Sequence, residues 1–152
     1  MGVKRPPFFM LINYSDHINK LNDFRQGKTR EALKLGHKEI DSSFRFVAGN
    51  MNFILGHNNV GKTHFTFYLM LLYSLKHNIK WLVFSSENDP VQLIKKLIEF
   101  IEGKPINKIE EKDYEESKDF VYNHFKCVDI NRQYTYKQLL DLAEKVKEAW
   151  DY

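Results

Sequence analysis

The sequence predicts a parallel α/β fold that carries a phosphate-binding loop. Apolar segments with strand character alternate with segments of helical spacing, an order that produces a parallel sheet with right-handed crossovers. Residues 56–63 read Gly-His-Asn-Asn-Val-Gly-Lys-Thr and match the whole P-loop pattern G-x-x-x-x-G-K-S/T. Residues 81–86 begin with an apolar run, typical of a strand that is buried on both faces of such a sheet.

Composition indicates a globular domain. The chain has 152 residues, of which 43% are hydrophobic and 14% aromatic, enough to bury a core. Its formal net charge of +3 is too small to indicate a nucleic-acid partner by itself. Cys127 is the single cysteine, which excludes an internal disulfide and a multi-cysteine metal site. We therefore expect a reducing, cytoplasmic setting.

No targeting or membrane segment is expected. The apolar stretch at residues 8–12 is too short for the core of a signal peptide. The apolar run at residues 65–75 has roughly half the length needed to span a bilayer.

The first part of the chain is the least regular. Residues 1–34 are expected to form an N-terminal arm or linker, with weak helical spacing over residues 15–25. The basic stretch at residues 28–38 favours a solvated loop over a nucleic-acid contact. Residues 43–47 alternate as a strand does, and residues 50–55 are expected to form the strand that leads into the P-loop.

Helices are predicted before and after the apolar strand at residues 81–86 in the sequence. Residues 64–77 have no Gly or Pro and are apolar almost all round, which indicates a buried helix. Asp89 as N-cap and Pro90 at the first helical position begin a helix that runs to Gly103.

From residue 107 on, the sequence again predicts helices that alternate with a strand. Residues 107–119, rich in Glu, Asp and Lys, favour a solvated helix over a metal site, since they lack EF-hand spacing. Residues 125–130 predict a further strand. A last helix is expected to begin at Thr135 or Tyr136.

Each part of the P-loop has a mechanical role in holding phosphate. Gly56 and Gly61 allow backbone conformations that bring main-chain N–H groups close to phosphate oxygens. Lys62 supplies positive charge to the β- and γ-phosphates, and the hydroxyl of Thr63 can bind Mg²⁺. The sequence therefore predicts binding of a nucleoside triphosphate and Mg²⁺, and the resemblance described below implies that the nucleotide is ATP. The expected phosphate-binding residues are Gly56, His57, Asn58, Asn59, Val60, Gly61, Lys62 and Thr63.

Glu87 is a candidate catalytic residue. It follows the predicted strand at residues 81–86, and ligands collect at the carboxyl ends of strands in open α/β sheets. In one interpretation its carboxylate activates the water that attacks the γ-phosphate, while Lys62 stabilises the developing charge. In the other, Glu87 is an exposed residue that favours the start of the next helix through its charge.

Three segments carry a resemblance to a known family. Residues 44–49, the P-loop and residues 83–88 resemble the RecA-like ATPase core of replicative DNA helicases, the DnaB and phage primase–helicase (Twinkle-like) group. Asp129 and residues 134–139 resemble the following strand and helix, so the resemblance covers roughly residues 35–150. It implies a P-loop NTPase fold with a mostly parallel sheet flanked by helices.

The resemblance also implies a function. In the complete protein, ATP hydrolysis would drive DNA unwinding by a homo-oligomeric ring that holds single-stranded DNA, with Glu87 as the catalytic base. The family further requires an acidic residue that holds Mg²⁺ through water, DNA-binding loops and an arginine finger. We expect these to follow the last helix, so that residues 35–152 form a partial ATPase domain, incomplete on its C-terminal side. Asp129 is a less favoured candidate for the acidic residue.

Two other functions stay open. One is a non-hydrolysing P-loop module that binds nucleotide and docks on a helicase or recombinase. Such a module would not need the acidic residue that holds Mg²⁺ in addition to Glu87. The activity of this chain alone is therefore uncertain. A small-molecule or nucleotide kinase is less favoured, because an Arg-rich lid is typical of such enzymes and residues 104–134 contain only Arg132.

Overall fold

The computed structural model describes residues 17–28, 32–129 and 131–150. The chain divides into two compact units, Met1–Asn52 and Phe53–Tyr152. The apolar stretch at residues 8–12 lies outside the described residues.

The first unit contains short helices. α1 spans Ile18–Arg25, which confirms the helix expected near residues 15–25, and α2 spans Lys38–Ser43. The strand expected over residues 43–47 is wrong, because only Phe46 pairs, in an isolated antiparallel bridge with Leu33. A single bridge leaves most of this backbone without the ladder that stabilises a strand.

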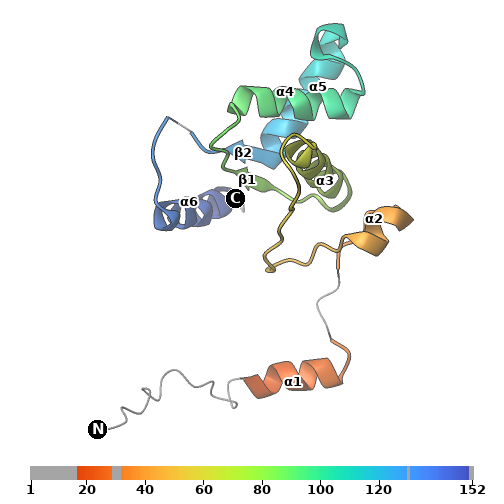
Figure 1. The fold of residues 1–152 in the computed structure, drawn as a ribbon, viewed down its shortest axis with the longest axis vertical. Helices are drawn as coiled ribbons and strands as arrows, with labels where there is room; N and C mark the ends of the chain where they lie inside the picture. The colour runs from red at the N-terminus through yellow and green to blue at the C-terminus, as the bar shows by residue number, and fades with distance from the viewer. Residues whose placement is uncertain (1–16, 29–31, 130, 151–152) are drawn as a thin grey trace. The chain divides into compact units, whose positions relative to one another are not determined.

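The second unit is a mixed α/β structure with a small parallel sheet (Figure 1). Strands β1 (Trp81–Val83) and β2 (Phe125–Cys127) pair in parallel, with Trp81 opposite Phe125 and Val83 opposite Cys127. The N–H of Val128 extends the pairing by donating to the Val83 carbonyl at 2.9 Å. The helices are α3 (Lys62–His77), α4 (Pro90–Glu102), η3 (Ile106–Lys108), α5 (Glu111–His124) and α6 (Tyr136–Trp150).

The strand expected to lead into the P-loop is wrong. Residues 51–57 belong to no helix or strand, and the side chains of Phe53 and Leu55 are 75% and 90% exposed. A strand becomes stable only when its backbone pairs and one face is covered, and here neither happens. In the described part of the chain the parallel sheet therefore has two strands.

The core lies on one face of the sheet, under α3, α4 and α5. Its most deeply buried side chains are Leu71, Leu97, Ile98 and Val121. The indole N–H of Trp81 donates to the Ser74 hydroxyl at 2.9 Å and so ties β1 to α3.

The expected ends of α4 are confirmed. The Asp89 carboxylate accepts a hydrogen bond from the Val91 N–H at 3.0 Å, Pro90 occupies the first turn, and Gly103 ends the helix with φ +64°. Beyond Gly103 the Glu99 carboxylate holds the chain by accepting from the Ile106 N–H at 3.0 Å.

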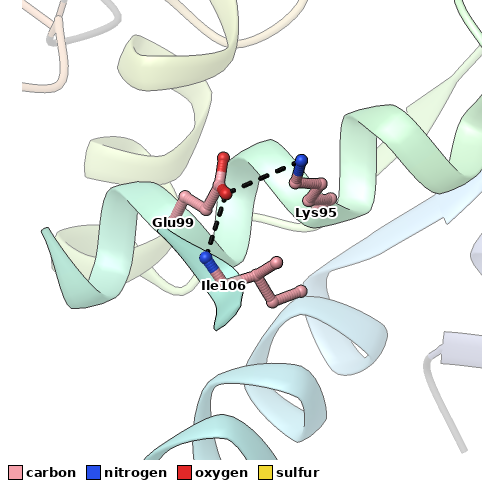
Figure 2. Close-up of polar contacts among 3 residues, drawn as sticks. All are labelled: Lys95, Glu99 and Ile106. Carbon is pink, nitrogen blue, oxygen red and sulfur yellow. Dashed lines mark hydrogen bonds and ion pairs between the residues drawn. The ribbon is translucent and has the colours of Figure 1, made fainter. Parts of the chain in front are cut away.

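The same carboxylate oxygen also pairs with the Lys95 ammonium, at 3.9 Å, and Figure 2 shows the three residues together. The turn after α4 is thus fixed by a side chain one helical turn before its end.

α6 lies on the other face of the sheet. Its residues Leu142 and Val146 line a pocket together with Leu82 of β1 and Val128. At the end of the helix, the Lys80 ammonium donates to the Trp150 carbonyl at 3.3 Å. Within the described ranges, none of the helices is both long enough and apolar enough to cross a bilayer.

Candidate functional site

The loop at residues 56–63 has the predicted left-handed glycine at Gly61 but not at Gly56, whose φ is not positive. Gly61 adopts φ +86° and ψ +19° immediately before α3, and Asn59 adopts φ +59°. Glycine takes this left-handed conformation without steric cost, and asparagine tolerates it better than most residues. The order Asn-Val-Gly therefore turns the chain sharply into the helix.

The start of α3 offers unpaired hydrogen-bond donors. The first closed turn is made by the Phe65 N–H, which donates to the Gly61 carbonyl at 2.9 Å. Among the described residues no acceptor faces the N–H groups of Lys62, Thr63 and His64. These groups also lie at the positive end of the dipole of a 16-residue helix. The arrangement is suited to an anion.

Lys62 folds back over the loop. Its ammonium donates to the carbonyls of Gly56 at 3.0 Å and His57 at 2.5 Å. A Cβ at position 56 would stand 3.3 Å from Val60 Cγ2 and 3.4 Å from Lys62 Cδ. The lack of a side chain at Gly56 thus leaves room for the lysine stem, and the positive charge is held within the loop.

Two hollows meet at the loop and bring the predicted site residues together. The larger one, of about 1130 Å³, is lined by loop residues and by side chains of α3 and α4. The smaller one, of about 380 Å³, lies between α3 and the segment that follows β1. Lys62, Thr63 and Glu87 line both hollows.

Glu87 is placed by the turn after β1. The Ser85 hydroxyl accepts hydrogen bonds from the N–H of Asn88 at 3.1 Å and from its side-chain amide at 3.3 Å, which closes the turn around Glu87. The Glu87 side chain is exposed, and it makes no hydrogen bond or ion pair with any residue that the structure describes. Asp89, not Glu87, supplies the side-chain cap of α4.

Asp129 occupies a different place. It follows β2, the neighbouring parallel strand, and its carboxylate accepts from the N–H and the side-chain amide of Asn131, both at 2.9 Å. It lines the pocket beneath α6 and is not among the residues that line the hollows at the loop. In the described part of the chain, Glu87 is the carboxylate that both of those hollows share.

Sequence reasoning missed an aromatic group in the larger hollow. The ring of Phe100 in α4 meets His64 at 4.5 Å and Tyr68 at 5.6 Å between centroids, edge to face in both pairs. The four-residue spacing of His64 and Tyr68 puts them on one side of α3 and was a usable signal. Phe100 was not predictable, because its place depends on how α4 packs against α3.

The donor set fits phosphate and a hydrated Mg²⁺. Unpaired N–H groups and the Lys62 ammonium suit phosphate oxygens. No three His, Cys, Asp or Glu side chains gather into a metal-binding group in the described ranges. Mg²⁺ bound with phosphate needs only one or two protein oxygens, however. The Thr63 hydroxyl and the Glu87 carboxylate border the same hollows and could supply them.

The chain matches no protein family, no curated protein and no solved structure with which it was compared. The features that bear on its function are therefore the loop, the two hollows and the residues that line them.

Proposed function

We propose that the chain binds a nucleoside triphosphate, ATP with Mg²⁺, through residues 56–63. The observation that carries the proposal is the group of three N–H donors at the start of α3, at Lys62, Thr63 and His64, which have no acceptor among the described residues. They stand beside an ammonium group that the loop itself holds in place. Fixed donors and a fixed positive charge bind phosphate without having to be ordered first.

Lys62 would exchange acceptors when phosphate enters. Its ammonium now donates to neutral carbonyls of Gly56 and His57. A phosphate oxygen is a charged acceptor and makes a stronger hydrogen bond. The Thr63 hydroxyl would hold Mg²⁺, which neutralises charge on the β- and γ-phosphates when bound. Glu87 borders the same hollows and would accept a proton from the attacking water.

We further propose that the chain is the ATP-binding portion of a RecA-like replicative helicase. The resemblance of residues 44–49, 56–63 and 83–88 to that family supports this lineage. So does the position of Glu87 beyond the carboxyl end of a parallel strand. In the complete protein, ATP hydrolysis would then drive a ring along single-stranded DNA.

One observation favours a second function, a nucleotide-binding module that does not hydrolyse. Among the described residues that line the two hollows, Glu87 is the one carboxylate, and Asp129 lies under α6. Hydrolysis generally uses one carboxylate for Mg²⁺ and another group for the water. A site with a single acid can hold the nucleotide and leave it intact.

Titration calorimetry of the whole chain with ATP and Mg²⁺ tests the binding. We expect Lys62→Ala to weaken binding by about tenfold or more, because a charge-assisted hydrogen bond contributes about 1.5–3 kcal/mol. Lys76→Ala is the matched control, since it removes a lysine from the last turn of the same helix. Equal affinity in Lys62→Ala and the unaltered chain would contradict the proposal.

Phosphate release then separates the two functions. If the unaltered chain hydrolyses ATP, faster with single-stranded DNA, and Glu87→Gln binds ATP without hydrolysing it, the helicase proposal is supported. If both bind ATP equally and neither releases phosphate with DNA present, the non-hydrolysing module is supported instead.

A further inference from the structure

The larger hollow extends from the loop into the space between α3 and α4, where an aromatic wall borders it. This wall consists of His64 and Tyr68 of α3 and Phe100 of α4. Phe100 meets both other rings edge to face, at interplanar angles of 90° and 76°. The three rings therefore hold one another in place, so a ligand that packs against them orders few additional side chains.

Apolar surface remains uncovered in this hollow. Tyr68 is 41% exposed, and Phe65, which lines the same hollow, is 47% exposed. Of the described residues, two lysines, Lys62 and Lys96, and one carboxylate, Glu87, also line it, which gives this lining a positive formal charge. Exposed rings beside a net positive charge favour a ligand with a flat ring and an anionic group.

The distance along α3 between the loop and the aromatic wall suits a single ligand that contacts both. Tyr68 follows Lys62 by six residues, which places it about 9 Å farther along the helix axis. A ribose with its phosphate chain bridges a gap of that order. A ligand anchored by phosphate at the loop would thus bring its base to the wall.

We propose that the wall binds the base of the nucleotide whose phosphates occupy the loop. The inference rests on the proposed function and adds to it a site for the base and a rule for selectivity. The base is held by stacking and apolar contact, and every base has a flat face to offer. The site therefore takes nucleoside triphosphates with weak preference among bases, and it favours them over tripolyphosphate, which has no base.

The test compares ATP with inorganic tripolyphosphate, both with Mg²⁺, by titration calorimetry on the whole chain. We expect ATP to bind about tenfold more tightly, as base–aromatic stacking predicts. Tyr68→Ala should reduce this preference several-fold, and Tyr68→Phe should keep it. Tyr122→Ala, which removes an exposed tyrosine from α5, is the matched control and should leave the preference unchanged.

The ratio of the two affinities within one variant is the decisive quantity, because partial unfolding of Tyr68→Ala would lower both alike. Equal binding of ATP and tripolyphosphate by the unaltered chain would overturn the inference and leave phosphate binding intact. So would an undiminished preference in the double variant Phe65→Ala, Tyr68→Ala. If neither anion binds, the proposed function fails, and the inference fails with it.

Discussion

At the scale of single residues, the loop depends on a backbone conformation that glycine adopts most easily. Gly61 has φ +86°, and apart from its two chain neighbours no described residue has an atom within 4 Å of where a Cβ would stand. The cost of a side chain at this position is therefore conformational and not a clash. It falls at the point where the chain enters α3, whose residues Phe67 and Leu71 belong to the core.

We predict that Gly61→Ala lowers the free energy of unfolding by about 1–2 kcal/mol, the cost of placing an ordinary residue in the left-handed region. Gly61→Asn should cost less, because asparagine tolerates that region. Urea unfolding followed by circular dichroism measures both. Identical midpoints for the alanine variant and the unaltered chain would show that the loop relaxes without cost.

Cys127 gives a second prediction at this scale. Burial in β2 raises the pKa of its thiol above the ordinary value of 9.0. The thiolate is the reactive form, so we expect a disulfide reagent to label the folded chain more slowly than the chain unfolded in urea at pH 8. Equal labelling rates would contradict this.

The same shift sets a pH dependence. Above pH 9 the unfolded thiol loses its proton while the folded thiol keeps it, so the contribution of Cys127 to stability falls as the pH rises through this range. Cys127→Ala should lose less stability between pH 8 and pH 10 than the unaltered chain.

At the scale of elements, capping decides where α4 begins. Its first turn is closed by the Asp89 carboxylate on the Val91 N–H. We predict that Asp89→Ala lowers the free energy of unfolding by about 1 kcal/mol and that Asp89→Asn, which keeps a side-chain acceptor, loses much less. Thermal melts of the two variants compare them directly, and equal losses would show that the cap contributes little.

The helices were predictable because their signals are local. The spacing of apolar residues and the caps Asp89 and Gly103 act within one or two turns, and they gave α4 its observed ends. The prediction of a strand over residues 50–55 was wrong for the opposite reason. An apolar run there was compatible with a strand, but a strand depends on a partner that may lie anywhere in the chain.

The candidate site likewise has a part that the local sequence predicts and a part that it does not. The positions of Gly61, Lys62 and Thr63 followed from the motif. Two other features depend on how segments distant in sequence pack. Glu87, and not Asp129, borders the loop, and Phe100 completes an aromatic wall. No local pattern specifies those contacts.

At the scale of the whole molecule, the core belongs to one of the two units. Every residue of the main hydrophobic cluster, from Phe67 to Phe125, lies in Phe53–Tyr152. The junction near residue 52 carries exposed apolar side chains, with Met51 at 76% and Phe53 at 75%, and no helix or strand. Proteases attack exposed, irregular segments first.

We therefore predict that brief digestion with chymotrypsin cuts first among residues 51–55 and leaves a stable fragment that ends at or near residue 150. Mass spectrometry of the products over time identifies the cuts. If helices α3 to α5 are cut as quickly as the junction, the second unit does not hold together by its own core.

ATP with Mg²⁺ should change this pattern in one place. Leu55 precedes the loop directly and is 90% exposed. A phosphate on the loop would stabilise the folded conformation of residues 56–63, and cleavage follows the population of molecules in which the segment is transiently unfolded. Cutting after Leu55 should therefore slow with ATP, whereas cutting after Phe24 of α1, 66% exposed in the other unit, should not. In Lys62→Ala the protection should disappear at the same ATP concentration. Protection of both sites alike would indicate an effect of ATP on the protease and would count against binding at the loop.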